Sequence, residues 1–164
     1  MIKIFRKKEN HNLYSPISGL CKDIIECNDK TFSSKVMGDG FFVDPIENTV
    51  LSPCDGKVVA VFPTKHAIGI EMSNQCQIIL HVGIDTVKLG GKFFDLFVSK
   101  GDKVKAGQKL LKFDLKEMKE RNIDVSTIVV LLESEKYSLN KGKMDRQVNA
   151  KDLIVSIDKV NATT

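Results

Sequence analysis

Three short apolar runs follow one another within residues 57–82, KVVAVFPTKHAIGIEMSNQCQIILHV, and they decide the fold class. The runs are KVVAVF, AIGIEM and QIILHV, and they are separated by turn-forming residues such as Pro, Ser and Asn. Short runs rich in Val and Ile between turn residues are typical of β-strands. This stretch therefore predicts consecutive antiparallel strands rather than helices.

The same pattern of short apolar runs continues along the chain, at 109–113, 127–132 and 153–157. One segment differs: residues 114–121, DLKEMKER, predict a short surface helix in which Asp114 caps the N-terminus and Glu117 completes a capping box. We therefore predict an all-β fold, an antiparallel β-sandwich or flattened barrel with short surface helices.

The sequence also contains a weak internal repeat. Residues 15–19 (SPISG) and 52–56 (SPCDG) share the pattern SPxxG, and a third related turn lies at 101–107 (GDKVKAG). Each is followed by an apolar run, so we predict a duplicated strand–turn unit. Residues 1–13 are polar and charged after a short apolar start and are predicted to be a flexible or amphipathic basic tail. Residues 14–164 are predicted to form a single domain.

Composition and charge exclude several classes of protein. The chain carries 25 Lys and Arg against 21 Asp and Glu, a net charge of +4, but residues 10–99 hold seven basic and ten acidic side chains. With few aromatic residues and no continuous basic stripe, nucleic-acid binding is disfavoured. The longest apolar run, Ile128–Leu132, is too short to span a bilayer, and no apolar segment of a secretory signal is present. Four cysteines without a CxxC pair indicate reduced thiols in a cytoplasmic protein.

Two histidines are expected to meet on one sheet face. If a two-residue turn at Ser73-Asn74 joins the second and third runs, His66 lies directly opposite His81, and a four-residue turn leaves the pair diagonal on the same face. An odd shift would place them on opposite faces. Thr64 shares the face of His66. The side chains of Ile78, Leu80 and Val82 are expected to point into the core.

Three interpretations of this pair remain open from the residues alone. Two unrelated polar side chains can lie on a solvated face. A zinc-dependent hydrolase could use His66, His81 and Asp85, since His81 and Asp85 form an HxxxD pattern. A neutral imidazole can also accept a phosphoryl group as a nucleophile, when a second imidazole and a hydroxyl donate hydrogen bonds to the phosphoryl oxygens.

Several segments in order along the chain carry a resemblance to a known family: MGDG at 37–40, DP at 44–45, SPCDG at 52–56, TKHAIG at 64–69, HVGIDTV at 81–87 and GDKVKAGQ at 101–108. Together they resemble the IIA domain of the glucose family of the phosphoenolpyruvate-dependent sugar phosphotransferase system. The match covers about residues 14–157, and TKHAIG followed by HVGIDTV is its most specific part. The resemblance implies a β-sandwich of the duplicated hybrid motif type.

The resemblance also implies an activity and its residues. His81 matches the histidine that is phosphorylated on Nε2, His66 the second histidine that supports the phosphoryl group, and Thr64 a hydroxyl that bonds to this second imidazole. Asp29 and Asp85 match acids beside the site. The phosphoryl group would come from the phosphocarrier protein HPr and leave to a cysteine on the IIB domain of a sugar permease. The family needs no metal or other cofactor for this transfer, so zinc at His66 and His81 would be adventitious.

A partner-docking patch follows from the same resemblance, and its members are apolar positions around the site: Phe32, Val36, Met37, Phe62, Ile79 and Val87. The acidic middle of the chain suits a basic phosphocarrier, because electrostatic complementarity speeds encounter. Proteins of this family can also bind regulatory targets, which is a further expectation for this patch.

The chain departs from the family pattern at a few positions beside the site. Where the family usually has Asn-Gly-Glu-Gly-Phe, residues 90–94 read GGKFF, and Cys76 replaces a common glycine in the hairpin turn. A biotinyl or lipoyl carrier, which the turn at 101–107 also suggests, would need an exposed Met-Lys tip, and Met118-Lys119 falls in the predicted helix instead.

The first ten residues, MIKIFRKKEN, combine four basic side chains with apolar ones. Such a segment can form a short amphipathic helix that holds a cytoplasmic protein at the inner face of the membrane, or it can be a solubilising tail. Both interpretations remain open.

Overall fold

The computed structural model describes residues 11–159 of the chain. An eight-stranded antiparallel sheet forms its largest layer, in the order β13-β2-β3-β11-β7-β6-β5-β9. Its strands are β2 (Gly19–Asp23), β3 (Gly38–Pro45), β5 (Gly56–Val61), β6 (Ala67–Glu71), β7 (Gln77–Val82), β9 (Lys103–Val104), β11 (Thr127–Leu132) and β13 (Arg146–Val148).

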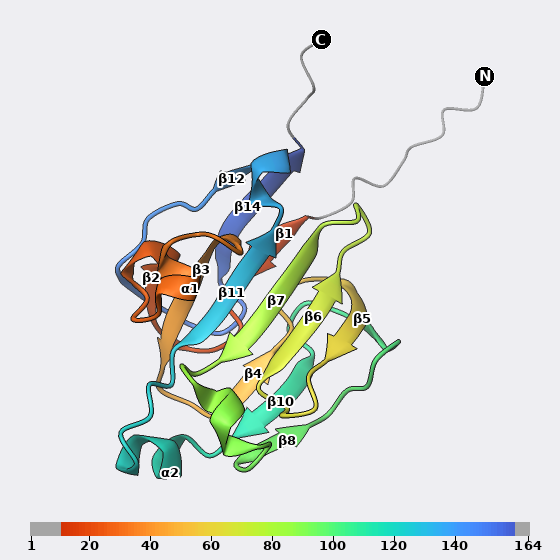
Figure 1. Cartoon of the computed structure of the whole chain (residues 1–164). Coiled ribbons are helices and arrows are strands. Elements are labelled where there is room, and N and C mark those ends of the chain that lie inside the picture. Colours follow the sequence, from red (N-terminus) through yellow and green to blue (C-terminus); the bar gives the residue numbers. More distant parts are fainter. Residues whose placement is uncertain (1–10, 160–164) are drawn as a thin grey trace, which may run out of the picture.

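Two three-stranded antiparallel sheets pack behind the large one, toward its opposite ends (Figure 1). One has the order β1-β14-β12 and the other β4-β10-β8. Their strands are β1 (Asn12–Tyr14), β4 (Thr49–Leu51), β8 (Phe94–Leu96), β10 (Lys109–Phe113), β12 (Tyr137–Asn140) and β14 (Leu153–Lys159). The large sheet is open, since within the described residues β13 and β9 are its edges. The predicted antiparallel β-sandwich is confirmed, and the fold is not a closed barrel.

Short helices connect the strands, as predicted. They are η1 (Ile24–Glu26), α1 (Lys30–Ser33), η2 (Thr86–Leu89), α2 (Leu115–Glu120) and η3 (Ser134–Lys136). Asp114 caps α2 as expected, because its carboxylate accepts a hydrogen bond from the backbone N–H of Glu117 at 3.0 Å. The other half of the capping box does not form. Glu117 instead accepts from Arg121 Nε at 2.8 Å, one turn later.

The internal sequence repeat corresponds to a structural repeat. The hydroxyl of Ser15 donates to the carbonyl two residues later at 2.7 Å, and Ser52 makes the same 2.7 Å bond in its own turn. Both serines are 1% exposed. The residue before each serine donates its backbone N–H to the proline carbonyl of the other turn, at 2.8 Å in both cases. The two SPxxG turns are therefore copies of one unit that pair with each other.

Hydrophobic side chains are buried on both faces of the large sheet. The main core lies between the sheets and includes Ile78, Leu80 and Val82, all 0% exposed, as predicted. A smaller cluster lies on the other face, under η1 and α1: Ile24, Cys27, Phe32, Phe42, Ile128 and Val130. This second cluster fixes η1 and α1 against the outer face of the sheet, where the odd-numbered residues of β7 also point.

The predicted register of the β6–β7 hairpin is wrong. Ala67, not His66, lies opposite His81, and the hairpin closes through a three-residue loop, Ser73–Gln75. Gln75 adopts the left-handed conformation with φ of 68°, and the side chain of Asn74 accepts from the N–H of Cys76 at 3.0 Å. A left-handed third residue is typical of three-residue hairpin loops, and it produces the odd shift.

The boundary of the predicted tail also differs in the structure. β1 begins at Asn12 and pairs with β14, and Leu13 is 1% exposed in the main core. Residues 12 and 13 are therefore part of the sandwich rather than of a tail. Residues 1–10 of the predicted tail lie outside the described residues. No helix within residues 11–159 is both long enough and apolar enough to cross a bilayer.

Candidate active site

His81 lies one residue before the end of β7 and points to the outer face of the large sheet. Its strand neighbours on that face are Ala67 of β6 and Ile128 of β11. The Nδ1 atom of His81 is buried, and no atom of residues 11–159 makes a hydrogen bond of standard geometry with it. Because Nδ1 is in the interior, Nε2 is the ring nitrogen through which this side chain can react with an incoming group.

His66 reaches the same place by a different route. It lies in the bend between β5 and β6, where Lys65 takes the left-handed conformation with φ of 61°. The carbonyl of His66 accepts from the N–H of Val82 at 2.8 Å, yet its ring lies edge-on to that of His81, with centroids 4.8 Å apart. Strand alternation does not apply to a residue in a bend. The two predicted histidines therefore meet, although the register from which we predicted it is wrong.

Thr64 fixes the orientation of His66. Its Oγ1 lies 2.7 Å from Nδ1 of His66, a hydrogen-bond distance, and His66 is only 3% exposed. When the hydroxyl donates to Nδ1, the proton of the neutral ring is on Nε2. That nitrogen can then donate a hydrogen bond to an oxygen bound near His81.

Both imidazoles are held in the neutral form at neutral pH. Burial and, to a lesser extent, the adjacent His66 lower the pKa of His81 from 6.5 to about 4, although the backbone of Gly83 and the charge of Asp29 act in the opposite direction. Burial also lowers the pKa of His66. A neutral ring keeps the lone pair that a nucleophile needs, so the site is suited to attack on an electrophile.

Stability should depend on pH because of these shifts. The folded protein binds a proton at His81 only near pH 4, whereas the unfolded chain binds one near pH 6.5. Stability is therefore present above pH 6.5 and is lost as the pH falls toward 4. Between pH 7 and pH 5 we expect His81 to remove at most about 2 kcal/mol from the free energy of unfolding. Urea unfolding at both pH values measures this, and His81→Ala should show a clearly smaller difference; an equal difference in both proteins would contradict the assignment.

The two predicted acids differ in their relation to the histidines. Asp29 is the N-cap of α1, where its carboxylate accepts from the N–H of Thr31 at 2.9 Å, and its charge acts on His81. Asp85 occupies the N-cap position of η2 in the left-handed conformation without a side-chain hydrogen bond to the helix, is 67% exposed at its side chain and lies 4.0 Å from Lys88. Within residues 11–159, no three His, Cys, Asp or Glu side chains gather as metal ligands would. The zinc hydrolase that would use His66, His81 and Asp85 is therefore not supported.

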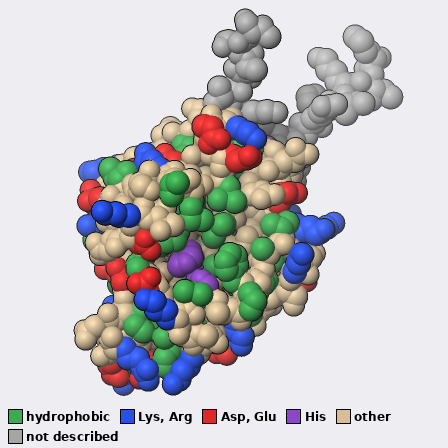
Figure 2. Space-filling model, viewed as in Figure 1, with side chains coloured by type: hydrophobic (Ala, Val, Ile, Leu, Met, Phe, Trp, Pro, Cys, Tyr) green, Lys and Arg blue, Asp and Glu red, His purple; other side chains and the backbone are tan. Residues whose placement is uncertain are grey.

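Apolar side chains surround the two rings. The Phe32 ring lies 4.9 Å from that of His81, and the Phe62 ring lies 5.7 Å from that of His66. Val36 and Val87 are 77% and 52% exposed, which is unusual for side chains of this size. The remaining patch members, Met37 and Ile79, are partly buried. Figure 2 shows the imidazoles on one face of the molecule, with hydrophobic side chains on most sides of them and acidic and basic groups on the remaining side.

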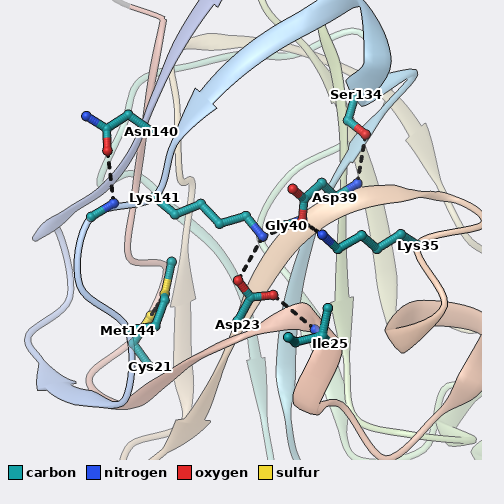
Figure 3. A network of polar contacts seen from close by, with 11 residues as sticks. Cys21, Asp23, Ile25, Lys35, Asp39, Gly40, Ser134, Asn140, Lys141 and Met144 are labelled. Atoms are coloured by element: carbon teal, nitrogen blue, oxygen red, sulfur yellow. Dashed lines mark hydrogen bonds and ion pairs between the residues drawn. The ribbon is translucent and has the colours of Figure 1, made fainter.

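A charged network that the sequence did not suggest anchors the segment bearing Phe32 and Val36 (Figure 3). Nζ of Lys141, in the β12–β13 connection, lies 3.0 Å from the carboxylate of Asp23 and also contacts Asp39. Asp23 in turn caps η1 through the N–H of Ile25 at 3.1 Å, and Lys35 lies 3.6 Å from Asp39. The two contacts of Lys141 join residues more than a hundred positions apart, which no local motif reveals.

Removing Lys141 should destabilise the protein. Its side chain is only 14% exposed, and Lys141→Ala would leave the carboxylates of Asp23 and Asp39 without this cation. We expect a loss of about 1–3 kcal/mol in the free energy of unfolding. Lys136→Ala is the matched control, because the Lys136–Glu133 pair is mostly exposed and should contribute little to stability. Equal effects of the two substitutions in urea unfolding would show that the network is not stabilising.

Comparisons with known proteins connect this geometry to a family. The family model described as phosphoenolpyruvate-dependent sugar phosphotransferase system, EIIA 1, matches residues 11–137. A glucose-specific EIIA component of Bacillus cereus is 42% identical over 129 residues, which cover 79% of this chain and 78% of that protein. A solved structure, glucose permease IIA from Mycoplasma capricolum, has a TM-score of 0.84 and 33% identity, and the match covers 95% of this chain and 99% of that one.

A longer relative contains the same domain as one part. The beta-glucoside-specific EIIBCA component of Bacillus subtilis (strain 168) is 40% identical over 145 residues, which are 88% of this chain but 24% of that protein. The chain therefore spans about a quarter of this fused relative. Sequence and fold agree, and the family resemblance inferred from TKHAIG and HVGIDTV is confirmed. The chain belongs to the EIIA 1 family of the phosphoenolpyruvate-dependent sugar phosphotransferase system.

Proposed function

We propose that this chain carries a phosphoryl group on Nε2 of His81, between the phosphocarrier protein HPr and a cysteine on the IIB domain of a glucose-type sugar permease. One observation supports this most strongly. His81 has its Nδ1 buried, and a second, buried imidazole lies edge-on to it with ring centroids 4.8 Å apart. This arrangement leaves one nucleophilic nitrogen and places a hydrogen-bond donor beside it.

The transfer consists of two displacements at phosphorus. In the first, the lone pair of Nε2 forms a bond to phosphorus while the bond from phosphorus to the donor protein breaks. In the second, the thiolate of the IIB domain forms the new bond and His81 leaves as a neutral imidazole. His66 donates from Nε2 to a phosphoryl oxygen, and Thr64, 2.7 Å from Nδ1, keeps the ring in that tautomer.

Partner binding is assigned to the patch of Phe32, Val36, Met37, Phe62, Ile79 and Val87. Val36 follows α1, which carries Phe32, and Val87 lies in η2, which follows β7; their exposed side chains suit a surface that is covered only while a partner is bound. Asp29 supplies negative charge for a basic phosphocarrier, and exposed Asp85 extends it along the rim. Any regulatory protein target would compete for this same patch.

The acceptor is inferred from the fused relative, whose printed name joins components B, C and A in one chain. A IIA domain that matches the A part needs a IIB partner, in the same polypeptide or in another. The four cysteines of this chain are all free and buried, and burial raises the pKa of each thiol. Such thiols suit the reducing cytoplasm, where we place the protein.

The basic start of the chain is assigned a role at the membrane. Residues 1–10 lie outside the described residues, so this proposal rests on their sequence alone. Removing residues 1–10 should reduce binding to vesicles that contain anionic lipid and leave binding to neutral vesicles unchanged. A sedimentation assay with both vesicle types measures this, and equal binding of the full and shortened chains would exclude the anchor.

A reconstituted relay tests the proposed function directly. Phosphoenolpyruvate, enzyme I and HPr are incubated with the chain, and phosphohistidine is detected by ³¹P NMR and located by mass spectrometry. The IIB domain of the Bacillus subtilis relative then serves as the acceptor probe. We expect one phosphoryl group per chain on His81, lost on addition of the acceptor. A chain that stays unphosphorylated, or is phosphorylated elsewhere, would overturn the proposal.

A further inference from the structure

Asp124 lies in the loop between α2 and β11 and makes hydrogen bonds with three groups. Its Oδ1 accepts from the backbone N–H of Ser126 at 2.9 Å and from the Ser126 hydroxyl at 2.6 Å. Its Oδ2 accepts from the side-chain amide of Asn28 at 3.2 Å. Burial opposes the charged form, but these bonds prevail and hold the pKa of Asp124 below its usual range. The Asp124 carboxylate is therefore ionised, and both of its oxygens accept hydrogen bonds from other residues of the protein.

The loop that Asp124 organises holds the backbone that follows His81. Two residues after His81, the N–H of Gly83 donates to the carbonyl of Ser126 at 2.8 Å. The next N–H, that of Ile84, donates to the carbonyl of Asp124 itself at 2.9 Å. Because the side chain of Asp124 fixes Ser126 and its main chain fixes Ile84, both contacts depend on the conformation of this one residue.

Gly83 is packed so closely that its position is determined by these neighbours. It has φ of 80°, and a Cβ atom there would lie 2.4 Å from Thr86 Cγ2 and 3.0 Å from the carbonyl oxygen of Asp124. Only glycine fits this combination of conformation and close approach. The peptide groups on either side of Gly83 therefore have little freedom as long as Asp124 stays in place.

The position of Gly83 matters for the ring of His81. Nδ1 of His81 is buried without a hydrogen bond of standard geometry to residues 11–159. The backbone of Gly83, two residues along the chain, nevertheless acts on the His81 ring and raises its pKa. Nε2 keeps its lone pair when the proton of the neutral ring is on the buried Nδ1, and a backbone carbonyl placed near Nδ1 would favour that tautomer. A small displacement of Gly83 would remove this preference between the two neutral tautomers.

The second oxygen of Asp124, Oδ2, binds Asn28, which lies in the segment that leads to α1. Asn28 directly precedes Asp29, and Asp29 caps the helix α1 that carries Phe32. The Phe32 ring lies against His81 with centroids 4.9 Å apart. Asp124 thus joins the backbone that follows His81 to the segment whose aromatic ring packs on it.

We propose that Asp124 is a positioning residue for His81, which holds Gly83 and α1 so that the imidazole presents the lone pair of Nε2 outward. This role rests on the proposed phosphoryl transfer, because it assigns Asp124 to the preparation of the same nucleophile. Asp124 acts through Gly83 and Asn28 and takes no part in bond making.

The test compares Asp124→Ala with Asp124→Asn and with a control aspartate. Asp102→Ala is the control, because Asp102 also holds a turn through one backbone N–H, that of Ser99 at 2.8 Å, at the β5–β9 edge of the sheet. Ring ¹⁵N NMR of His81 reports the tautomer without any partner protein. Phosphorylation by phospho-HPr, measured over a range of HPr concentrations, separates kcat from KM.

We expect Asp124→Ala to shift His81 toward a mixture of tautomers and to lower kcat by about tenfold or more, with KM changed less than about threefold. Asp124→Asn keeps an acceptor for Ser126 and should restore much of kcat, and Asp102→Ala should change neither quantity. A folded Asp124→Ala protein with the wild-type tautomer and kcat would overturn the proposal.

Two milder variants cover the case in which Asp124→Ala does not fold. Ser126→Ala and Asn28→Ala each remove one side-chain bond to Asp124, and each should shift the tautomer in the same direction by a smaller amount. Wild-type signals in both would equally overturn the role. If the wild-type chain is not phosphorylated on His81 at all, the proposed function fails, while the tautomer measurement still decides the role of Asp124.

Discussion

His81→Ala leaves the chain unable to take a phosphoryl group from phospho-HPr, with no measurable phosphohistidine after prolonged incubation. The physical reason is that His66 cannot replace it. His66 is 3% exposed and its Nδ1 is bonded to Thr64, so in the tautomer proposed above its Nε2 carries the ring proton and has no lone pair with which to attack phosphorus. Loss of the single nucleophile removes the covalent intermediate, not merely a rate enhancement.

The assay for this variant uses labelled phosphoenolpyruvate with enzyme I and HPr, and acid-labile label on the chain is counted. His11→Ala is the matched control, because it removes a histidine whose ring lies 3.3 Å from Ser73, at the hairpin turn and away from the paired rings. It should be labelled like the wild type. Normal labelling of the His81→Ala protein would refute the central assignment.

The second large effect is expected from His66→Gln, and it should separate the two halves of the relay. Glutamine fills much of the buried space and can still donate one hydrogen bond, so His81 should accept the phosphoryl group. Unlike imidazole, an amide cannot take up a proton as charge develops on the phosphoryl oxygens. We therefore expect onward transfer to the IIB probe to be slower by about a hundredfold.

Rapid-quench measurement of the decay of phosphorylated His66→Gln in the presence of the IIB domain gives this rate. Thr64→Val removes only the hydroxyl that orients His66, so it should slow the same step to a smaller extent. The order of the three rates, wild type, Thr64→Val and His66→Gln, is itself a test. If His66→Gln passes its phosphoryl group on at the wild-type rate, the second imidazole has no part in transfer.

Local patterns predicted most of the strands. The run at 127–132 coincides with β11 (Thr127–Leu132), and the run at 109–113 coincides with β10 (Lys109–Phe113). These runs are short, rich in β-branched residues or leucine, and bounded by turn residues. Their strand conformation could therefore be predicted from the local pattern of apolar residues. The two SPxxG turns at residues 15–19 and 52–56 could also be predicted, because each is defined by a few neighbouring residues. That the two turns pair with each other could not be predicted from the motif.

The features that the sequence concealed depend on backbone conformation or on distant contacts. Gln75 and Lys65 both adopt positive φ, although neither is a residue type that favours it, and together they set the hairpin register and the place of His66. Lys141 meets Asp23, and Asp124 meets Asn28, across 118 and 96 positions of sequence. Such pairs depend on how the strands are arranged in the folded protein, so they cannot be predicted from local sequence patterns.

The pairing of the first described strand with the last has a consequence for how this domain is connected to others. β1 and β14 are antiparallel neighbours, with Asn12 opposite Ser156. The start of the first described strand and the end of the last one therefore lie at the same end of the sandwich (Figure 1). A tether joined at either end therefore begins from the same place and need not cross the histidine face. This geometry allows the domain to be joined to other polypeptides at either end. It can be attached to other components in one polypeptide, as in the fused EIIBCA relative, or circularly permuted through a short linker between residues 12 and 159, while the histidine face stays uncovered.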